Sequence, residues 1–381
     1  MPTYSFDEIA INSNEKVKAE NIDQTLYIGL EHLESGSLTV KNWGSAVPIK
    51  GDKLVMRKGD VLFGKRNAYL RRAAIAPHDG AFSAHGMVFR PKENVIAKEF
   101  FPLFIASDYF FDAAIRISVG SLSPTVNWKD LKKIEFTIPT ISEQKKLSEI
   151  LWAMNNTKEA YNRLINLTDD LVKSQFIEMF GNISSGKYKY PTKKLGDVAD
   201  VKSSHRIFTK EFVDSGVPFY RGTEIGQLAK GQIPTDLYYI SNERYKEIAS
   251  DDSKPQKGDL LMPSICDKGQ VWLVDTDEPF YYKDGRVLCI SPNRSTCNSK
   301  FLQYFMKQKT EIEYPKLGPG STFAEFKIFL LKDMDILIPP ITEQQNFASF
   351  VEQSDKSKFE LKKALSELTA TYKQIIKENI G

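Results

Sequence analysis

The chain is poor in the side chains that most often bind metals. Its three cysteines, Cys266, Cys289 and Cys297, all lie in the second half of the 381 residues and form no C-x-x-C pair. This spacing disfavours a disulfide framework or a zinc site, and reduced thiols are typical of the cytosol. Only four histidines are present, scattered along the sequence. We interpret them as surface or packing residues rather than as general bases or metal ligands.

Motifs that carry catalysis are also missing. The sequence has no G-x-x-x-x-G-K-[S/T] phosphate loop, no G-x-G-x-x-G fingerprint, no H-E-x-x-H and no G-x-S-x-G. Asp60 and Asp259 recur in the phrase K-G-D followed by two apolar residues, which predicts a turn into a buried strand rather than a nuclease site. The prolines between Ile338 and Ile341 lack the preceding acidic or amide residue of an amino-methyltransferase. We therefore expect a non-catalytic protein.

Long apolar runs and targeting segments are absent too. No run reaches eighteen apolar residues, and the start MPTYSFDEIAINSNEK lacks a basic stretch followed by an apolar one. We expect no membrane partner and a cytoplasmic location. The net charge of +3 is too small to indicate nucleic acid by itself.

What the sequence does contain is a duplication. LKKIEFTIPTISEQ at 131–144 returns as LKDMDILIPPITEQ at 331–344, an offset of 200 residues. Upstream, the K-G-D phrases at 58–63 and 257–262 match at an offset of 199, and 6–10 matches 195–199 at 189. The drop in offset predicts an insertion between Val201 and Lys257, in a loop that absorbs length at little entropic cost.

Each copy of the repeated phrase is followed by about forty residues without proline or internal glycine. These stretches predict two long helices of roughly 57 Å, with Ser142 and Thr342 as N-caps. The apolar stripes that would join them are interrupted in the first helix by Thr168 and Gln175. Their members are Leu147, Leu151, Met154, Tyr161, Ile165 and Val172 in the first helix, and Leu361, Leu365, Leu368, Tyr372 and Ile375 in the second.

The expected fold class is α+β, with two β-rich domains, each followed by a long helix, and the two helices packed antiparallel as a coiled-coil spacer in a pseudo-two-fold repeat. With 41% hydrophobic and 27% charged residues, the chain is long enough for two cores. The expected parts are 1–140, a first β-rich domain; 141–181, a central helix; 182–194, a linker; 195–340, a second β-rich domain; and 341–381, a distal helix.

Basic, amide and aromatic residues gather at several places, in a mixture that suits DNA because arginine and lysine bind phosphates and guanine while asparagine reads adenine. The candidates in the first half are Lys41, Asn42, Trp43, Lys65, Arg66, Asn67, Tyr69, Arg71, Arg72 and Ser121. The candidates in the second half are Lys202, Ser204, His205, Arg206, Arg221, Thr223, Lys268, Gln270, Ser321 and Thr322. A solvated basic loop or a plain turn is the alternative at each place.

The duplicated phrase before a long helix, the K-G-D strands and the opening KLGDVADV at 194–201 resemble the specificity subunit of type I restriction-modification systems. The likeness spans essentially the whole chain, although the first module starts so near Met1 that no separate N-terminal conserved segment is expected. It implies two target-recognition domains, each reading one half of a bipartite, asymmetric site in double-stranded DNA, held apart by the helices.

The same resemblance implies partners. Two methylation subunits would dock on the helices, and restriction subunits would join that core. It implies no cofactor on this chain, with S-adenosylmethionine, ATP and magnesium in the partner subunits. Two alternatives stay open: a helical scaffold with no DNA role, which leaves the basic loops without a purpose, and a nuclease with a DNA-reading domain, for which no carboxylate cluster can be assembled.

Overall fold

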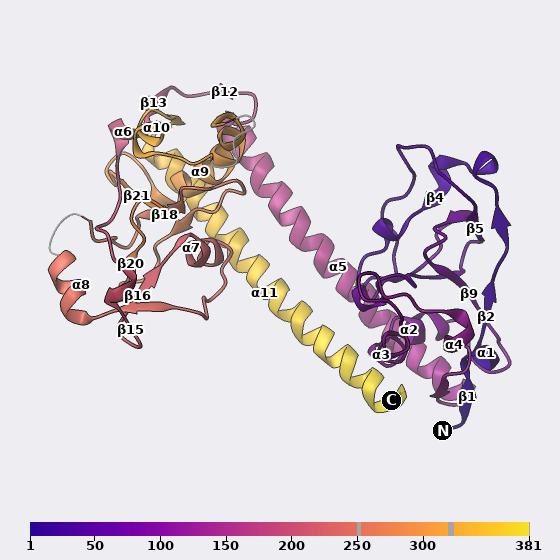
Figure 1. Ribbon diagram of the computed structural model, residues 1–381. Coiled ribbons are helices and arrows are strands. Elements are labelled where there is room, and N and C mark those ends of the chain that lie inside the picture. The colour runs from indigo at the N-terminus through magenta and orange to yellow at the C-terminus, as the bar shows by residue number, and fades with distance from the viewer. Residues whose placement is uncertain (250–252, 319–323, 381) are drawn as a thin grey trace. The chain divides into compact units, whose positions relative to one another are not determined.

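The computed structural model describes residues 1–249, 253–318 and 324–380. Its contacts group the chain into two compact units (Figure 1). Unit 1 comprises Met1–Leu164 and Leu361–Gly381, and unit 2 comprises Ile165–Glu360. Each unit therefore contains one β-rich module and a part of both long helices. The five-part division expected from the sequence stays a prediction.

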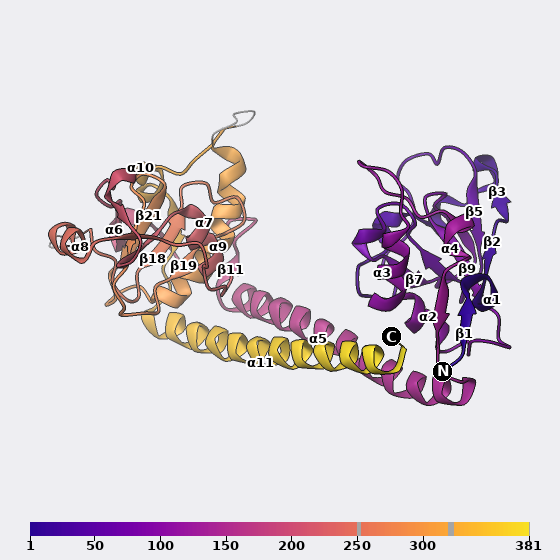
Figure 2. The ribbon, with the colours of Figure 1, turned by 60° about the horizontal axis from the view of Figure 1, so that its bottom comes forward.

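Each module contains a first four-stranded sheet, and its strand order is the same in both modules. In unit 1 its strand order is β2 (Ala10–Ser13), β9 (Met87–Pro91), β6 (Val61–Phe63) and β7 (Ala73–Ile75). In unit 2 the order is β14 (Ala199–Lys202), β21 (Val287–Pro292), β18 (Leu260–Pro263) and β19 (Trp272–Leu273) (Figure 2). All neighbours are antiparallel, and the register repeats, with Ala10 opposite Pro91 and Ala199 opposite Pro292.

A second four-stranded sheet is wired differently in the two units. In unit 1 its order is β3 (Lys16–Val17), β5 (Lys53–Met56), β8 (Gly80–Phe82) and β4 (Tyr27–Ile28). In unit 2 it is β15 (Phe212–Val213), β17 (Tyr238–Ile240), β16 (Val217–Tyr220) and β20 (Tyr281–Tyr282). Since β8 directly precedes β9 and β20 directly precedes β21, β8 corresponds to β20. The two strands at this end of the sheet have therefore exchanged places between the repeats.

Short strands and helices complete each module. The paired short strands are β1 (Thr3–Ser5) with β10 (Glu135–Thr137), β13 (Thr192–Lys194) with β22 (Asp335–Leu337), and β11 (Gly181–Asn182) with β12 (Lys187–Tyr188). The helices of the first module are α1 (Phe6–Ile9), α2 (Phe101–Ile105), α3 (Asp108–Arg116) and α4 (Trp128–Leu131). Those of the second are α6 (Leu195–Val198), α7 (Gly222–Leu228), α8 (Asn242–Ile248), α9 (Ser299–Glu313) and α10 (Ile328–Lys332).

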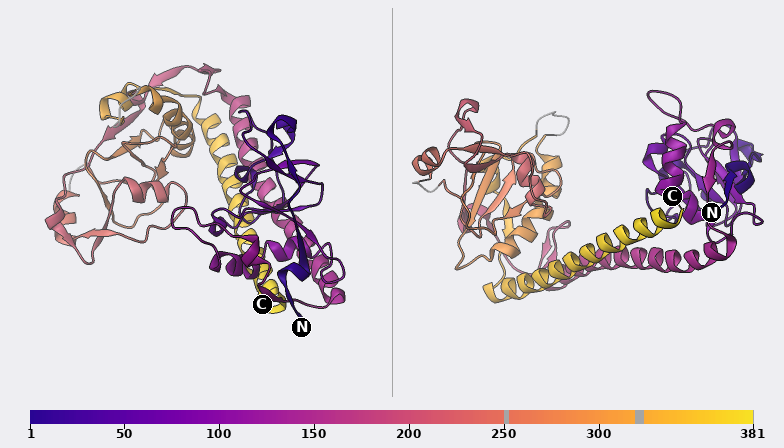
Figure 3. Two further views of the ribbon diagram at one scale, coloured as in Figure 1. Left: turned by 45° about the vertical axis from the view of Figure 1, so that its right-hand side comes forward. Right: turned by 90° about the horizontal axis from the view of Figure 1, so that it is seen from below.

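The two long helices are α5 (Ile141–Phe180) and α11 (Ile341–Ile380), each of 40 residues (Figure 3). In unit 1 the beginning of α5, around Leu151, shares a core with Ile376 and Ile380 at the end of α11. In unit 2 the end of α5 shares a core with the beginning of α11, where Phe176 meets Phe347 edge-on. The pair is therefore antiparallel, and the predicted fold class is confirmed. Among the described residues, no helix is long and apolar enough to cross a membrane.

The predicted N-caps are wrong. Both helices begin at the isoleucine before them, so Ser142 and Thr342 lie inside the first turn. In α5 the cap is Thr140, whose N–H and hydroxyl both donate to the Glu143 carboxylate, at 2.9 and 2.8 Å. This is the reciprocal arm of a capping box, and these hydrogen bonds lower the pKa of Glu143.

The repeated glutamine is a buried connector between each long helix and its module. Gln144 is fully buried; its Oε1 accepts from Ala97 N at 2.7 Å, and its Nε2 donates to the carbonyls of Pro139 and Val95 at 2.8 and 3.2 Å. Gln344 repeats the pattern: its Oε1 accepts from Asn298 N, and its Nε2 donates to the carbonyls of Pro339 and Thr296. Each amide thus joins a helix start to a loop of the module.

The K-G-D phrases form the expected turns into buried strands. Gly59 and Gly258 have φ of +92° and +91°, a conformation that favours glycine. The following aspartates are buried; Asp60 accepts from the N–H of Arg57 at 2.8 Å and forms a two-pronged ion pair with Arg90. These carboxylates are therefore engaged in holding the turn.

The connector can be tested with two neighbouring glutamines. Replacing Gln344 with leucine keeps the volume but leaves buried backbone groups without partners, so we expect the free energy of unfolding to fall by about 3 kcal/mol. Gln345 is exposed, and its replacement with leucine should change it by less than about 0.5 kcal/mol. Urea unfolding of the full chain measures both. Equal losses in the two variants would contradict the connector role.

Candidate nucleic-acid interface

In unit 1 the candidate interface is the loop that follows β6. It holds a short 3₁₀ turn, Ala68–Leu70, bracketed by Asn67 and Arg71 at φ of +54° and +48°. Left-handed backbone at non-glycine residues is costly and persists only where the surroundings impose it. Here the Asn67 N–H donates to the carbonyl of Pro124 at 2.7 Å. The turn leaves Tyr69 at its tip with 55% of its surface exposed.

Positive charge converges beside this turn. Arg66 is exposed, and its guanidinium donates to the Ser123 hydroxyl at 3.2 Å, within the 120–125 loop that also exposes Ser121. Burial first, and then the charges of Arg66, Lys65 and Lys53, lower the pKa of His85.

Lys65 is half-buried in the same place, and its pKa is lowered first by burial and then by Lys16. Lys16, Lys53 and His85 were not predicted. They lie on β3, β5 and the turn before β9, so only the folded arrangement of the two sheets brings Lys16 to Lys65 and Lys53 to His85.

Other predicted residues of the first module are engaged within the chain. Arg71 forms ion pairs with Asp108 and Asp112 of α3. These pairs hold the turn against α3, so Arg71 is not a free cation. Lys41 pairs with Glu34 at 2.7 Å, and Trp43 meets the ring of His78 edge-on. Exposure differs among the remaining members, with Asn42 exposed and Arg72 half-buried.

In unit 2 the structure brings three predicted residues into one hollow of about 660 Å³. Arg221 and Thr223 come from the start of α7, and Gln270 from the loop before β19. Three unpredicted cations complete the lining: Lys230, Lys283 and Arg286. Arg286 directly precedes β21, as the His85–Gly86 turn precedes β9, so alignment of the two repeats would have drawn attention to it.

Ion pairs and stacking hold the cations of this hollow. Arg221 pairs with the buried Glu224 at 2.6 Å and stacks over the ring of Tyr238 at 4.5 Å. The hydrogen bond that Arg221 donates to Glu224 is the main cause of the raised pKa of Arg221. Arg286 pairs with Glu325 at 3.0 Å, with a largely exposed side chain. A planar, fixed guanidinium of this kind suits phosphate or the guanine edge.

The other predicted residues of the second module lie outside this hollow. The Ser204 hydroxyl donates to the carbonyl of Tyr282 at 2.6 Å, and Arg206 pairs with Asp284. His205 and Lys268 are exposed, and Lys202 lines a separate hollow with Asp259. Ser321 and Thr322 lie outside the described residues.

The remaining question is which reactive or metal-binding groups the described residues provide. Within the described parts of the chain, no group of three or more histidine, cysteine, aspartate or glutamate side chains could hold a metal ion. The cysteines are all buried and free, and burial raises the pKa of Cys266 to about 11 and that of Cys297 to about 12. What both modules expose is arginine, lysine, amide and tyrosine groups on loops carried by sheets.

Comparison with solved structures places the fold. The S subunit of a type I restriction-modification system from M. genitalium matches 100% of this chain and 96% of its own, with a TM-score of 0.62 and 14% identity. A chain from a study of complex assembly and conformational transition of the type I R-M system matches 99% of this chain and 97% of its own, with a TM-score of 0.56 and 18% identity.

Sequence comparison gives the family. The model of the type I restriction modification DNA specificity domain matches twice, at residues 8–168 and 188–369, and the chain belongs to this family. The MjaIX specificity subunit of Methanocaldococcus jannaschii is 24% identical over 78% of this chain and 71% of its own length. A candidate specificity subunit of Haemophilus influenzae, S.HindORF215P, is 31% identical over 42% of this chain, which spans 39% of that relative.

Two arginines of the first module should behave differently on DNA. Replacing Arg66 with alanine should remove one phosphate contact and lower the salt dependence of binding, log affinity against log salt, by about 1. Replacing Arg71 should leave this slope unchanged, because its guanidinium already faces Asp108 and Asp112, but should lower the melting temperature. Fluorescence anisotropy of the assembled complex at several salt concentrations measures the slopes. A lower slope for the Arg71 variant and an unchanged slope for the Arg66 variant would contradict this assignment.

Proposed function

We propose that this chain is the DNA-reading subunit of a type I restriction-modification complex and that each module reads one half of a bipartite, asymmetric site. The observation that carries the proposal is the contrast between the two sheets. The sheet built on β6 and β18 is identical in both units, whereas the sheet built on β3 and β15 is rewired. A common frame that presents different loops predicts two different half-sites.

The loops have the chemistry to divide this task between phosphates and bases. Exposed cations such as Arg66 and Lys230 would contact phosphates and set the register. Tyr69 and Gln270 offer stacking and amide groups for base edges. We propose the other predicted residues as further contacts to double-stranded DNA, apart from Arg71, whose guanidinium is engaged by Asp108 and Asp112.

The two long helices would fix the distance between the half-sites, as dimer geometry fixes half-site spacing in other DNA-binding proteins. In this proposal the chain is cytoplasmic and assembles with two methylation subunits and with restriction subunits. S-adenosylmethionine, ATP and magnesium would act in those partners, and this chain would supply recognition without catalysis.

The proposal predicts a single split methylation motif. The chain would be co-expressed with its neighbouring methylation subunit in a host without such marks, and N6-methyladenine would be mapped across the genome. We expect one asymmetric motif made of two short half-sites and a fixed spacer. An assembled complex that leaves no new methylation would overturn the proposed function.

Lengthening both helices tests how the spacer is set. The two units divide between Leu164 and Ile165 and between Glu360 and Leu361, so seven residues inserted at both points leave each unit intact. Seven residues keep the apolar stripe in phase and add about 10 Å, or roughly three base pairs. The methylated motif should keep its half-sites and gain that spacing. The same insertion in one helix alone should destabilise the chain, and an unchanged spacer would show that the helices do not set the distance.

A further inference from the structure

Two lysines occupy equivalent places in the duplicated helices. Lys158 of α5 and Lys358 of α11 each lie fourteen residues after the buried glutamine of their repeat. Both are partly buried. The chain therefore provides a comparison of one lysine in two settings.

In unit 2 the charged lysine is paired with carboxylates of the same chain. Lys358 pairs with Asp169 of α5 at 2.7 Å and with Asp355 of its own helix at 3.1 Å. Asp355 also accepts from Lys300 of α9 at 2.9 Å. Burial works against the charge on Lys358, but the hydrogen bonds that Lys358 donates to both aspartates outweigh this effect and raise its pKa.

In unit 1 the same two partner positions carry no charge. The residue equivalent to Asp355 is Asn155, and the one equivalent to Asp169 is Thr369. Among the described residues, no carboxylate lies within 4 Å of the Lys158 ammonium, which instead faces the ring of Tyr372 at 5.0 Å. Burial is the main cause of the lowered pKa of Lys158. The charge of Glu159 raises this pKa, and that of Lys373 lowers it further.

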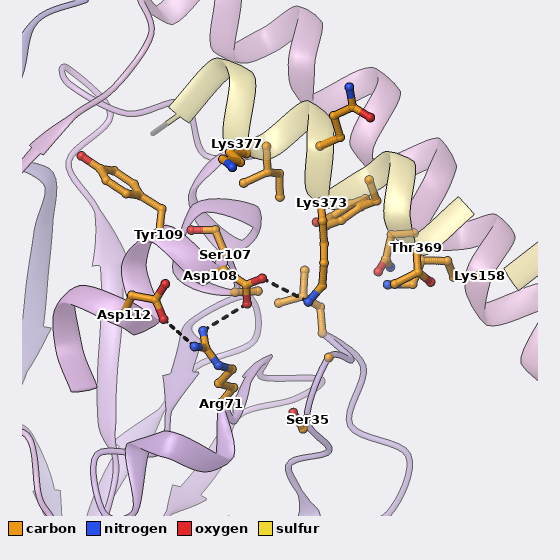
Figure 4. Close-up of a pocket in the computed structure, with 17 residues that line it drawn as sticks. Ser35, Arg71, Ser107, Asp108, Tyr109, Asp112, Lys158, Thr369, Lys373 and Lys377 are labelled. Atoms are coloured by element: carbon orange, nitrogen blue, oxygen red, sulfur yellow. Dashed lines mark hydrogen bonds and ion pairs between the residues drawn. The ribbon is translucent and has the colours of Figure 1, made fainter. Parts of the chain in front are cut away.

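A cavity of about 520 Å³ opens beside Lys158, and Figure 4 shows its lining. Asn155, Thr369 and Tyr372 all border it, so the missing partners and the empty space coincide. Apolar surface of Leu38 and Ile376 forms another part of the wall.

The other charges in this cavity leave a positive excess. Its two aspartates, Asp108 and Asp112, are held by Arg71, and Asp108 also by Lys373 at 3.1 Å, as the dashed lines in Figure 4 trace. Lys377 stands at the edge, and within the described chain neither it nor Lys158 has an ion-pair partner. The cavity therefore has two cations to offer an incoming anion.

We propose that this cavity binds an acidic side chain of the methylation subunit, whose carboxylate takes beside Lys158 the place that Asp355 and Asp169 take beside Lys358. The inference rests on the proposed function for the identity of the partner. Lys158 would then gain its carboxylate partner only on assembly, whereas Lys358 has its partners within the chain.

A protein side chain suits this cavity better than a free small acid. One carboxylate against one partly exposed ammonium contributes too little for a dissolved acid to occupy the cavity at ordinary concentrations. The same carboxylate carried on a larger protein surface is held there at a high effective concentration. Apolar walls would at the same time accommodate the carbon chain of the side chain.

The first test compares the equivalent lysines. Lys158→Gln removes the charge and leaves a shorter, polar side chain. We expect the Kd for the methylation subunit, measured by biolayer interferometry with the full chain, to rise at least tenfold. Lys358→Gln is the matched control, because its partners are internal: it should lower the melting temperature and leave this Kd within twofold of wild type. A Lys158→Gln chain with wild-type melting and a Kd within twofold of wild type would overturn the proposal.

A second variant copies the unit 2 network into unit 1. Asn155→Asp with Thr369→Asp would give Lys158 its own carboxylates, so the free chain should melt higher while the Kd for the methylation subunit rises at least tenfold. A higher melting temperature with an unchanged Kd would show that the cavity plays no part in assembly.

A free acid as the occupant is tested with sodium glutamate. If 50 mM glutamate raised the melting temperature of the wild-type chain but not of Lys158→Gln, and assembly were unaffected by that variant, the partner assignment would be wrong. The proposed function fails separately: a wild-type complex that assembles without methylating a split motif contradicts DNA reading and leaves the Kd comparison valid.

Discussion

Each module of this protein depends on the end of the long helix that follows the other module. Ile376 and Ile380, at the end of α11, are buried in the core of the first module, and Phe176 and Phe180, at the end of α5, in the core of the second. Each core therefore contains side chains from both long helices. Burying four large side chains in this way contributes several kcal/mol, on the order of 1.5–3 kcal/mol each.

This arrangement fixes both ends of both helices. The start of each is joined to its own module by the buried amide of Gln144 or Gln344, and its end is buried in the other module. Each long helix is therefore anchored at both of its ends. The second sheets bear no such constraint, which explains how their strand order could diverge while the first sheets kept theirs.

Much of this fold could be predicted because its signals are local or repeated. The helix stripes, the K-G-D turns and the duplication follow from periodicity and from exact spacing. The N-cap of α5 differs from the predicted Ser142 because Thr140 and Glu143 satisfy the S/T-x-x-E pattern two residues earlier. The candidate interface was harder to predict, because ion pairs between distant segments decide which cations are free. Nothing local distinguishes Arg66 from Arg71, whose partners lie 37 and 41 residues further along.

Comparison of the two repeats distinguishes residues that hold the shared fold from residues that differ in their surroundings. Where both halves keep a group, as with the buried glutamines and the K-G-D aspartates, the group holds a helix or a turn in place. Where one half keeps a lysine but loses both of its carboxylates, the frame has not changed, yet the electrostatic balance has. A charge retained without its partner, beside a cavity rather than in open solvent, is costly to the free chain. A carboxylate from outside the chain would restore beside Lys158 the balance that Asp169 and Asp355 give Lys358.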